Sequence, residues 1–145
     1  LHLAVSLERE DIVRLLIKAG ADVTLTDKIY KLTPLHIAAY TGNEPIVKML
    51  LDAGSDIYAA DSKDWTPLMI MARYGHSDIL INFFKNAKII KSHSDHINGC
   101  LDVLKKNHHE AYDKFNDHIQ SLLREDTLKR NDNSKAVVTG YEYDI

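Results

Sequence analysis

The sequence predicts an all-α solenoid, in which helix–turn–helix units with short hairpin fingers stack side by side and a C-terminal helical cap closes the stack. Two observations support this fold class. The segment LHLA at residues 1–4 returns as LHIA at residues 35–38, an offset of 34. The second half of the unit repeats as well, because DIVRLLIKAGAD at residues 11–22 matches PIVKMLLDAGSD at residues 45–56. Such a recurrence is typical of stacked repeats.

The first helix of each unit is expected to begin at a threonine–proline pair. Thr33 suits the N-cap, because its hydroxyl can accept a hydrogen bond from the first turn, and Pro34 suits the first helical position. His36 lies three residues after the cap and can reach back to it. Gly42 is expected to end the helix, since glycine tolerates the left-handed conformation. The next unit repeats this frame with Thr66, Pro67, Gly75 and, in place of the histidine, Met69.

The second helix of the full unit is expected from about Pro45 to Asp52. Its apolar residues fall on one face, and Gly54 ends it. A third copy of this helix, DILINFFKNAKI at residues 78–89, keeps the apolar spacing but has lost the glycine and the final aspartate. Helices this short are not stable alone, so stacking must stabilise them.

The stretch LTPLHIAAYTGNEPIVKMLLDAGSD, residues 32–56, resembles an ankyrin repeat almost position for position. The resemblance implies L-shaped units made of a finger and two helices, with a concave binding face. Residues 1–93 then hold three repeats, which are a truncated one (1–26), a full one (27–60) and a diverged one (61–93).

Several positions depart from the family pattern. The finger over 27–33 has one residue more than its counterpart and is expected to be longer or bulged. Asp64 stands where the family usually has glycine, and aspartate can occupy the left-handed region at modest cost. Ala87 and Ile89 replace the usual glycine and aspartate, so the regular finger is expected to end there.

The C-terminal third predicts two more helices. Residues 94–106 place Ile97, Cys100, Leu101 and Leu104 on one face, and residues 108–125 carry a second apolar stripe. The simplest interpretation is that residues 94–130 form a helical cap or a degenerate fourth repeat. The alternative is the first part of a different domain. Residues 131–145 are interpreted as a tail or a short extended segment.

Composition excludes some classes of function. The net charge is −3 and the pI about 6.2, which argues against a general nucleic-acid binder. No apolar run approaches the ~20 residues that span a bilayer, so no membrane insertion is expected. A single cysteine excludes an internal disulfide. We expect a monomer in the cytoplasm, or in the host cytosol if the protein is a secreted effector. The chain starts inside a motif, which predicts a fragment of something longer.

Three chemical interpretations compete with structural ones. His36 could be a catalytic base, but the repeat exchanges it for Met69, which favours a capping role. His96 and Cys100 would share a helix face and could form a metal pair, but the cysteine belongs to the apolar stripe and no second pair completes the ligands. A cysteine nucleophile would need an oxyanion hole and a pocket, and the sequence signals neither. We therefore expect no catalytic residue, no metal and no cofactor.

The predicted function is binding of a partner protein on the concave surface, and this module could belong to a larger host-directed or scaffolding protein. The resemblance implies that finger tips and outer ends of the first helices contact the partner. The positions of this sequence that match those finger tips and helix ends are Ser6, Leu7, Ile29, Tyr30, Leu32, Tyr40, Thr41, Lys63, Trp65, Arg73 and Tyr74.

The alternative to this predicted function is the targeting segment of a multidomain enzyme or effector whose catalytic domain lies outside this chain.

Overall fold

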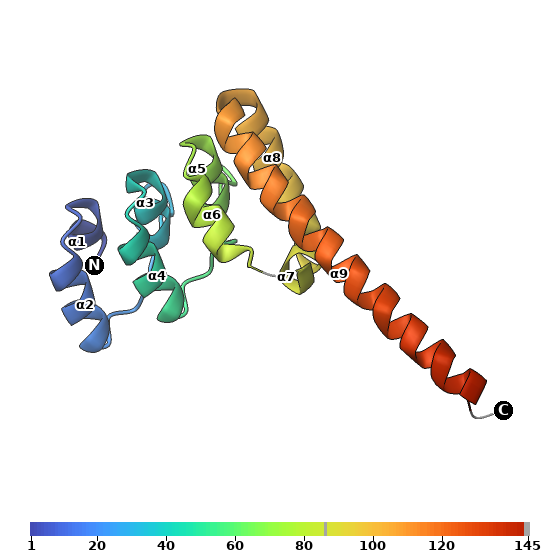
Figure 1. Cartoon of the computed structure of the whole chain (residues 1–145). Coiled ribbons are helices and arrows are strands. Elements are labelled where there is room, and N and C mark those ends of the chain that lie inside the picture. Colours follow the sequence, from blue (N-terminus) through green and yellow to red (C-terminus); the bar gives the residue numbers. More distant parts are fainter. Residues whose placement is uncertain (86, 144–145) are drawn as a thin grey trace.

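The computed structural model describes residues 1–85 and 87–143, with side chains for residues 1–85 and 90–131. Within these residues the backbone forms nine helices and no strand, and the first six helices stack in pairs along one axis (Figure 1). The predicted all-α solenoid is therefore confirmed. The helices are α1 (His2–Ser6), α2 (Glu10–Lys18), α3 (Pro34–Thr41), α4 (Glu44–Asp52), α5 (Pro67–Arg73), α6 (Ser77–Phe83), α7 (Ala87–Ser92), α8 (Ser94–Asn107) and α9 (His109–Tyr143).

Helix α3 begins with the predicted capping box. The backbone N–H of His36 donates to Oγ1 of Thr33 at 3.3 Å, and the backbone N–H of Thr33 donates to Nδ1 of His36 at 3.0 Å. Two free donors of the first turn are thus satisfied reciprocally. Helix α5 keeps half of this arrangement, because the N–H of Met69 donates to Oγ1 of Thr66 at 3.2 Å, but a methionine cannot return the bond.

His36 also joins its own repeat to the next one. Its Nε2 lies 3.0 Å from the carbonyl oxygen of Trp65. A carbonyl only accepts, so Nε2 carries the hydrogen and Nδ1 is left to accept from Thr33. His2 makes the equivalent bond one repeat earlier, with Nε2 2.9 Å from the carbonyl oxygen of Leu32. The capping histidine is therefore also a link between neighbouring repeats.

His36→Ala is expected to lower the free energy of unfolding by about 2 kcal/mol, because both the cap bond and the bond to Trp65 are lost. Urea denaturation followed by circular dichroism measures this loss. Thr33→Ala removes the same cap from the other side, so the double variant should lose less than the sum of the two single losses. Strictly additive losses would show that the two side chains act independently.

Helix α3 ends at Gly42 for two physical reasons. Its φ is 71°, in the left-handed region that glycine adopts without strain. The ring of His76, from the next repeat, also packs directly on it, and a Cβ atom at position 42 would lie 2.4 Å from Cε1 of His76. Helix α4 begins one residue before the predicted start, because Asn43 caps it through a bond from the N–H of Ile46 (3.1 Å).

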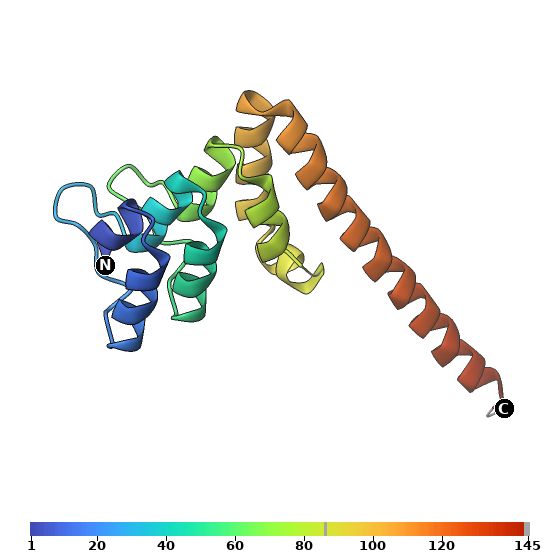
Figure 2. The same cartoon turned by 60° about the vertical axis from the view of Figure 1, so that its left-hand side comes forward.

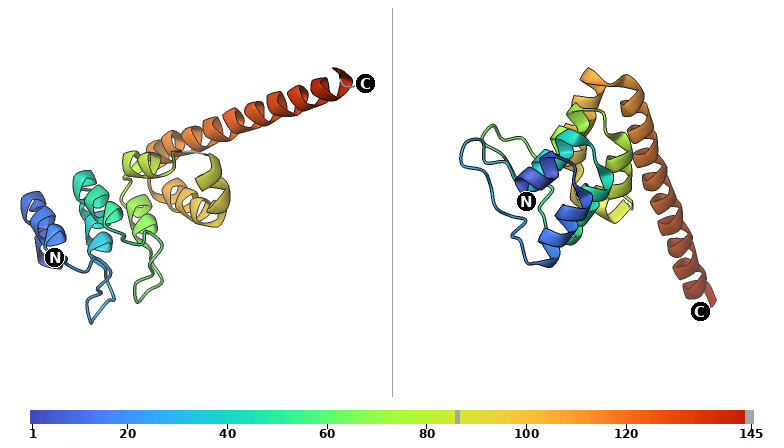
Figure 3. Two further views of the ribbon diagram at one scale, coloured as in Figure 1. Left: turned by 90° about the horizontal axis from the view of Figure 1, so that it is seen from below. Right: turned by 90° about the vertical axis from the view of Figure 1, so that its left-hand side faces the viewer.

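The two fingers project on one side of the stack (Figure 3), and an aspartate closes the base of each through backbone and side-chain hydrogen bonds. Oδ1 of Asp27 accepts from the N–H of Leu32 at 2.7 Å, and Oδ1 of Asp61 accepts from the N–H of Trp65 at 2.9 Å. Asp64 occupies the left-handed region, with φ 62°, as predicted. Lys31 does so too, with φ 55°, and it holds the equivalent position in the longer finger, two residues before Thr33 as Asp64 is before Thr66.

The core runs through the stack between the two rows of helices. The first helices of the repeats, α1, α3 and α5, pack in one row, and α8 lies against α5 as the next member of that row (Figure 1). Helices α2 and α4 pack in the second row, and α9 lies against α6. Fully buried side chains run from Val5 through Leu35 and Leu68 to Leu104, so one continuous core joins repeats and C-terminal helices.

Within the described residues, the third repeat has no regular finger after its second helix, as the exchanges at Ala87 and Ile89 predict. Its second helix ends at Phe83, and the separate short helix α7 (Ala87–Ser92) stands where a regular unit would place a finger. The prediction of a short extended segment over residues 131–143 is wrong, because α9 continues without a break to Tyr143 (Figure 2). This stretch contains no proline, and Gly140 alone does not end the helix. Residues 144 and 145 of the predicted tail lie outside the described residues.

Helix α9 extends well beyond the rest of the molecule (Figure 2). Its 35 residues correspond to about 50 Å at 1.5 Å per residue. Neither α9 nor any other helix in the described part combines the length and the apolar character that a membrane span requires.

Candidate functional site

The predicted binding residues lie mainly on what we call the concave surface, formed by the two fingers (residues 27–32 and 61–65) and the C-terminal ends of α1, α3 and α5. The ring centroids of Tyr40 and Tyr74 are 5.2 Å apart, with a tilt of 59°. The two side chains remain 45% and 50% exposed. We call them the tyrosine pair, and they confirm the expectation that adjacent repeats bring these helix ends together.

Most of the other predicted residues are also accessible. On the longer finger Ile29 and Tyr30 are exposed, and Leu32 at its base is half-buried. Thr41 is half-buried and its hydroxyl donates to the carbonyl of Ala38 at 3.1 Å, so it also helps to end α3. The remaining exposed positions of this set are Ser6, Leu7, Lys63 and Arg73.

Trp65 combines a structural and a surface role. Its indole is half-buried against the core, and its carbonyl oxygen accepts the bond from His36. The part of its side chain that stays accessible borders a cavity beside α8. Trp65 therefore packs against the core with one part of its side chain, and the other part remains available to a ligand.

Arg73 connects the third repeat to the C-terminal helices. Its guanidinium donates to Oδ1 of Asn107, and its carbonyl oxygen accepts from Nε2 of His108 at 2.7 Å. The His108 ring also packs on Gly75, in the way that His76 packs on Gly42. The repeat pattern puts Arg73 at the end of α5 but did not identify these partners, since no repeated motif marks the end of α8.

The cavity beside α8 has a volume of about 480 Å³. It opens between the shorter finger, the end of α5 and the last turns of α8. Six residues line it, which are Trp65, Arg73, Asp102, Val103, Lys106 and Asn107. Only the first two were predicted. The other four could have been expected on the exposed face of an amphipathic helix, but the sequence does not say which repeat that face would meet.

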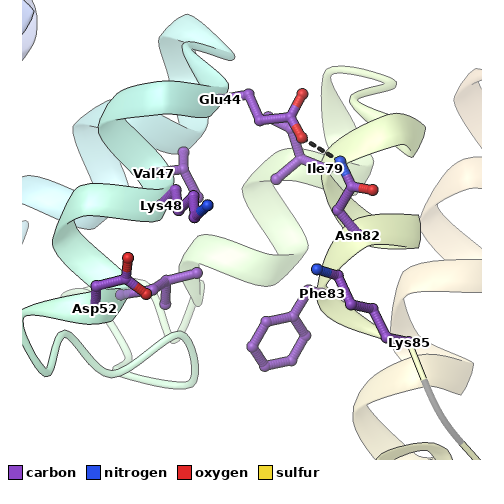
Figure 4. Close-up of a pocket in the computed structure, with 9 residues that line it drawn as sticks. Glu44, Val47, Lys48, Asp52, Ile79, Asn82, Phe83 and Lys85 are labelled. Atoms are coloured by element: carbon purple, nitrogen blue, oxygen red, sulfur yellow. Dashed lines mark hydrogen bonds between the residues drawn. The ribbon is translucent and has the colours of Figure 1, made fainter.

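A second cavity, of about 470 Å³, lies between the outer helices α4 and α6 (Figure 4). The carboxylate of Glu44 accepts a hydrogen bond from the side-chain amide of Asn82, which closes one end of the cavity. The ring of Phe83 reaches into the space between the two helices. Lys48 and Asp52 line the α4 side with opposite charges, so this groove has no preferred sign of charge.

Four of the C-terminal histidines contact other residues of the protein. Nε2 of His118 lies 2.9 Å from the carbonyl oxygen of Phe84, and His108 bonds Arg73 in the same way. The rings of His93 and His96 lie beside Tyr58, with centroids 4.7 and 4.1 Å from it. Within the described residues, no three potential ligands of the His, Cys, Asp or Glu type come together to hold a metal ion.

Cys100 is fully buried, and its Sγ lies 3.8 Å from the carbonyl oxygen of Leu68. Burial raises the pKa of its thiol from 9.0 to about 12. Burial likewise raises the pKa of the nearby Tyr58 hydroxyl to about 12, with smaller contributions from Cys100 and Asp56. Since the thiolate is the nucleophile, a thiol in this state is unsuited to catalysis.

Cys100 should therefore react with iodoacetamide at pH 8 far more slowly in the folded protein than in urea, as mass spectrometry would record.

The raised pKa of the Cys100 thiol also makes the free energy of unfolding fall as the pH rises, because the unfolded thiol ionises near 9 while the folded thiol keeps its proton until about 12. This contribution is complete below pH 9 and is lost between 9 and 12. Cys100→Val should lose less stability than the wild type between pH 8 and 10.5, and an equal loss in both would contradict the assignment.

The stacked helix pairs, the fingers at their tips and the accessible side chains along one face define a helical-repeat solenoid. A family model described as ankyrin repeats in three copies matches residues 1–93 of the 145, so the chain belongs to the ankyrin repeat family. Ankyrin repeats are in general protein–protein interaction modules, and the family is generally non-catalytic. Among curated proteins, none matches the chain by sequence.

Proposed function

We propose that this chain binds a partner protein on its concave surface, with the tyrosine pair at the centre of the contact. The observation that carries the proposal is that Tyr40 and Tyr74 lie in contact and yet stay about half exposed. Tyrosine buries a large area while few rotatable bonds become fixed, which is why it is enriched among binding hot spots. Ile29 and Tyr30 extend the same accessible face along the longer finger.

Site-specific photocrosslinking identifies the partner and the face it uses. A benzoylphenylalanine at Thr41, beside the tyrosine pair, should crosslink the partner in the native host of the protein. The same group at Lys48, on the outer helix α4, serves as the control and should not. Equal crosslinking from both positions, or crosslinking from Lys48 alone, would show that the partner does not use the concave surface.

Tyr74→Ala should weaken binding of the purified partner by about 2 kcal/mol, roughly a thirtyfold rise in Kd, because a packed aromatic contact is lost. Isothermal titration calorimetry measures the change. The melting temperature should fall only slightly, since the side chain is half exposed. Leu15→Ala is a matched control, because Leu15 is exposed on the outer helix α2 and should leave binding unchanged. Affinity lost only in proportion to unfolding would contradict the proposal.

A further inference from the structure

We propose that the cavity beside α8 receives an acidic side chain of the bound peptide, next to an apolar residue of the same peptide. This inference rests on the proposed function, because the ligand is a segment of the partner that continues from the tyrosine pair. Arg73 directly precedes Tyr74 at the end of α5. Tyr74 meets Tyr40 of α3 and Arg73 meets Asn107 of α8, so the tyrosine pair and the cavity lie on either side of the same helix end. The partner class is therefore an acidic peptide with a hydrophobic anchor.

The charges around the cavity favour an anion. Arg73 and Lys106 supply two positive charges at its rim, against the single negative charge of Asp102. The guanidinium of Arg73 bonds the neutral side chain of Asn107, so its charge is not neutralised there and donors remain free. Lys106 makes no ion pair within the part of the chain whose side chains are described. The site is thus locally positive on a chain whose net charge is −3.

The rest of the lining favours an apolar neighbour for that anion. Trp65 offers the accessible part of its indole, and Val103 lies on the facing turn of α8. A planar carboxylate suits this arrangement, because guanidinium binds carboxylates through parallel hydrogen bonds in one plane. The low polarity of the indole beside the cations strengthens the attraction relative to open water. A fully apolar peptide would leave both cations without a partner, and a basic one would be repelled.

Selection from a random dodecapeptide phage library on the full chain tests the proposal and does not require the partner to be identified first. Enriched peptides should carry Asp or Glu beside an aliphatic or aromatic residue. The peptide that binds most tightly is then synthesised in two versions, one with its Asp and Glu residues and one with Asn and Gln in their place. Fluorescence anisotropy measures the Kd of each version. The neutral version should bind about tenfold more weakly, and added salt should weaken the acidic version more than the neutral one.

Two charge reversals on neighbouring residues locate the effect. Lys106→Glu should raise the Kd of the acidic peptide about tenfold or more, because a like charge then borders the cavity. Lys105→Glu is the matched control, since Lys105 is exposed in the same last turn of α8 but does not line the cavity. It should change the Kd less than about twofold. Both variants should remain folded, because Lys105 and Lys106 are exposed, and circular dichroism verifies this.

The outcomes separate this inference from the proposed function. If selected peptides lose binding in Tyr74→Ala but bind Lys106→Glu normally, the concave surface is the binding site and the acidic specificity is wrong. If the enriched peptides are neutral or basic, the acidic specificity is also wrong. If acidic peptides bind through Lys106 but are indifferent to Tyr74→Ala, the cavity is a binding site and the role of the tyrosine pair is wrong. If no peptide is enriched, this inference fails.

Discussion

A chain that ends at residue 93 is expected to aggregate and to lose its cooperative unfolding transition. Helix α8 lies against α5, where Leu68 and Met71 are fully buried, and it contributes Ile97, Cys100 and Leu104 to the same core. Removal of residues 94–145 deletes α8 and would expose the α5 side of this contact to water. Each large apolar side chain returned to water costs about 1.5–3 kcal/mol, and a domain has only about 5–15 kcal/mol of stability in total.

A second truncation provides the control for this experiment. A chain that ends at residue 131 keeps α8 and the part of α9 that packs on the repeats, so its melting temperature should match that of the full chain. Differential scanning calorimetry and size-exclusion chromatography compare the three proteins. A monomeric 1–93 fragment with an unchanged melting temperature would contradict the role of residues 94–130 as a cap. It would support the alternative, in which these helices begin a separate domain.

Phe115→Ala is expected to lower the free energy of unfolding by about 3–5 kcal/mol. Phe115 is fully buried on α9, and its ring centroid lies 5.9 Å from that of Phe84, which is also fully buried. This pair joins the long helix to the end of the third repeat. The loss is large because the truncation leaves a cavity between two elements that other contacts hold in place.

A double-variant cycle with Phe84→Ala separates the pair from its surroundings. The interaction energy should be about 0.5–1.5 kcal/mol, as expected for two aromatic rings in contact. Chemical denaturation supplies the four free energies. Leu128→Ala, on the same helix but largely exposed, should change stability by less than about 0.5 kcal/mol. A loss at Phe115 as small as that at Leu128 would mean that α9 does not pack on the repeats in solution.

The local structure of the repeats could be predicted from the sequence because neighbouring residues determine it. Thr33, Pro34 and His36 lie within one helical turn, so their capping contacts follow from their spacing. The left-handed conformation of Asp64 followed in the same way from a position where glycine is usual. The proximity of Tyr40 and Tyr74 followed from the recurrence, since equivalent places in adjacent repeats must be neighbours when the repeats stack.

The candidate site could be predicted only in part. Trp65 and Arg73 belong to the repeated frame and were found through it, whereas Asp102, Val103 and Lys106 lie beyond the last recognisable repeat. No spacing relates those residues to a partner in the chain. Their place in the cavity depends on how α8 is rotated and shifted against α5, which the packing of many side chains decides together.

The sequence by itself determined the repeat, the capped starts of α3 and α5, the end of α3 at Gly42, and the helix ends on which the tyrosine pair lies. These features come from contacts between residues a few positions apart or one repeat apart, and each such contact has a pattern that can be read. The tertiary structure alone decided that Arg73 meets Asn107 and His108 and that a positively charged cavity forms beside Trp65. Those features arise where unlike elements pack against each other, and there shape and burial, rather than spacing along the chain, determine which side chains meet.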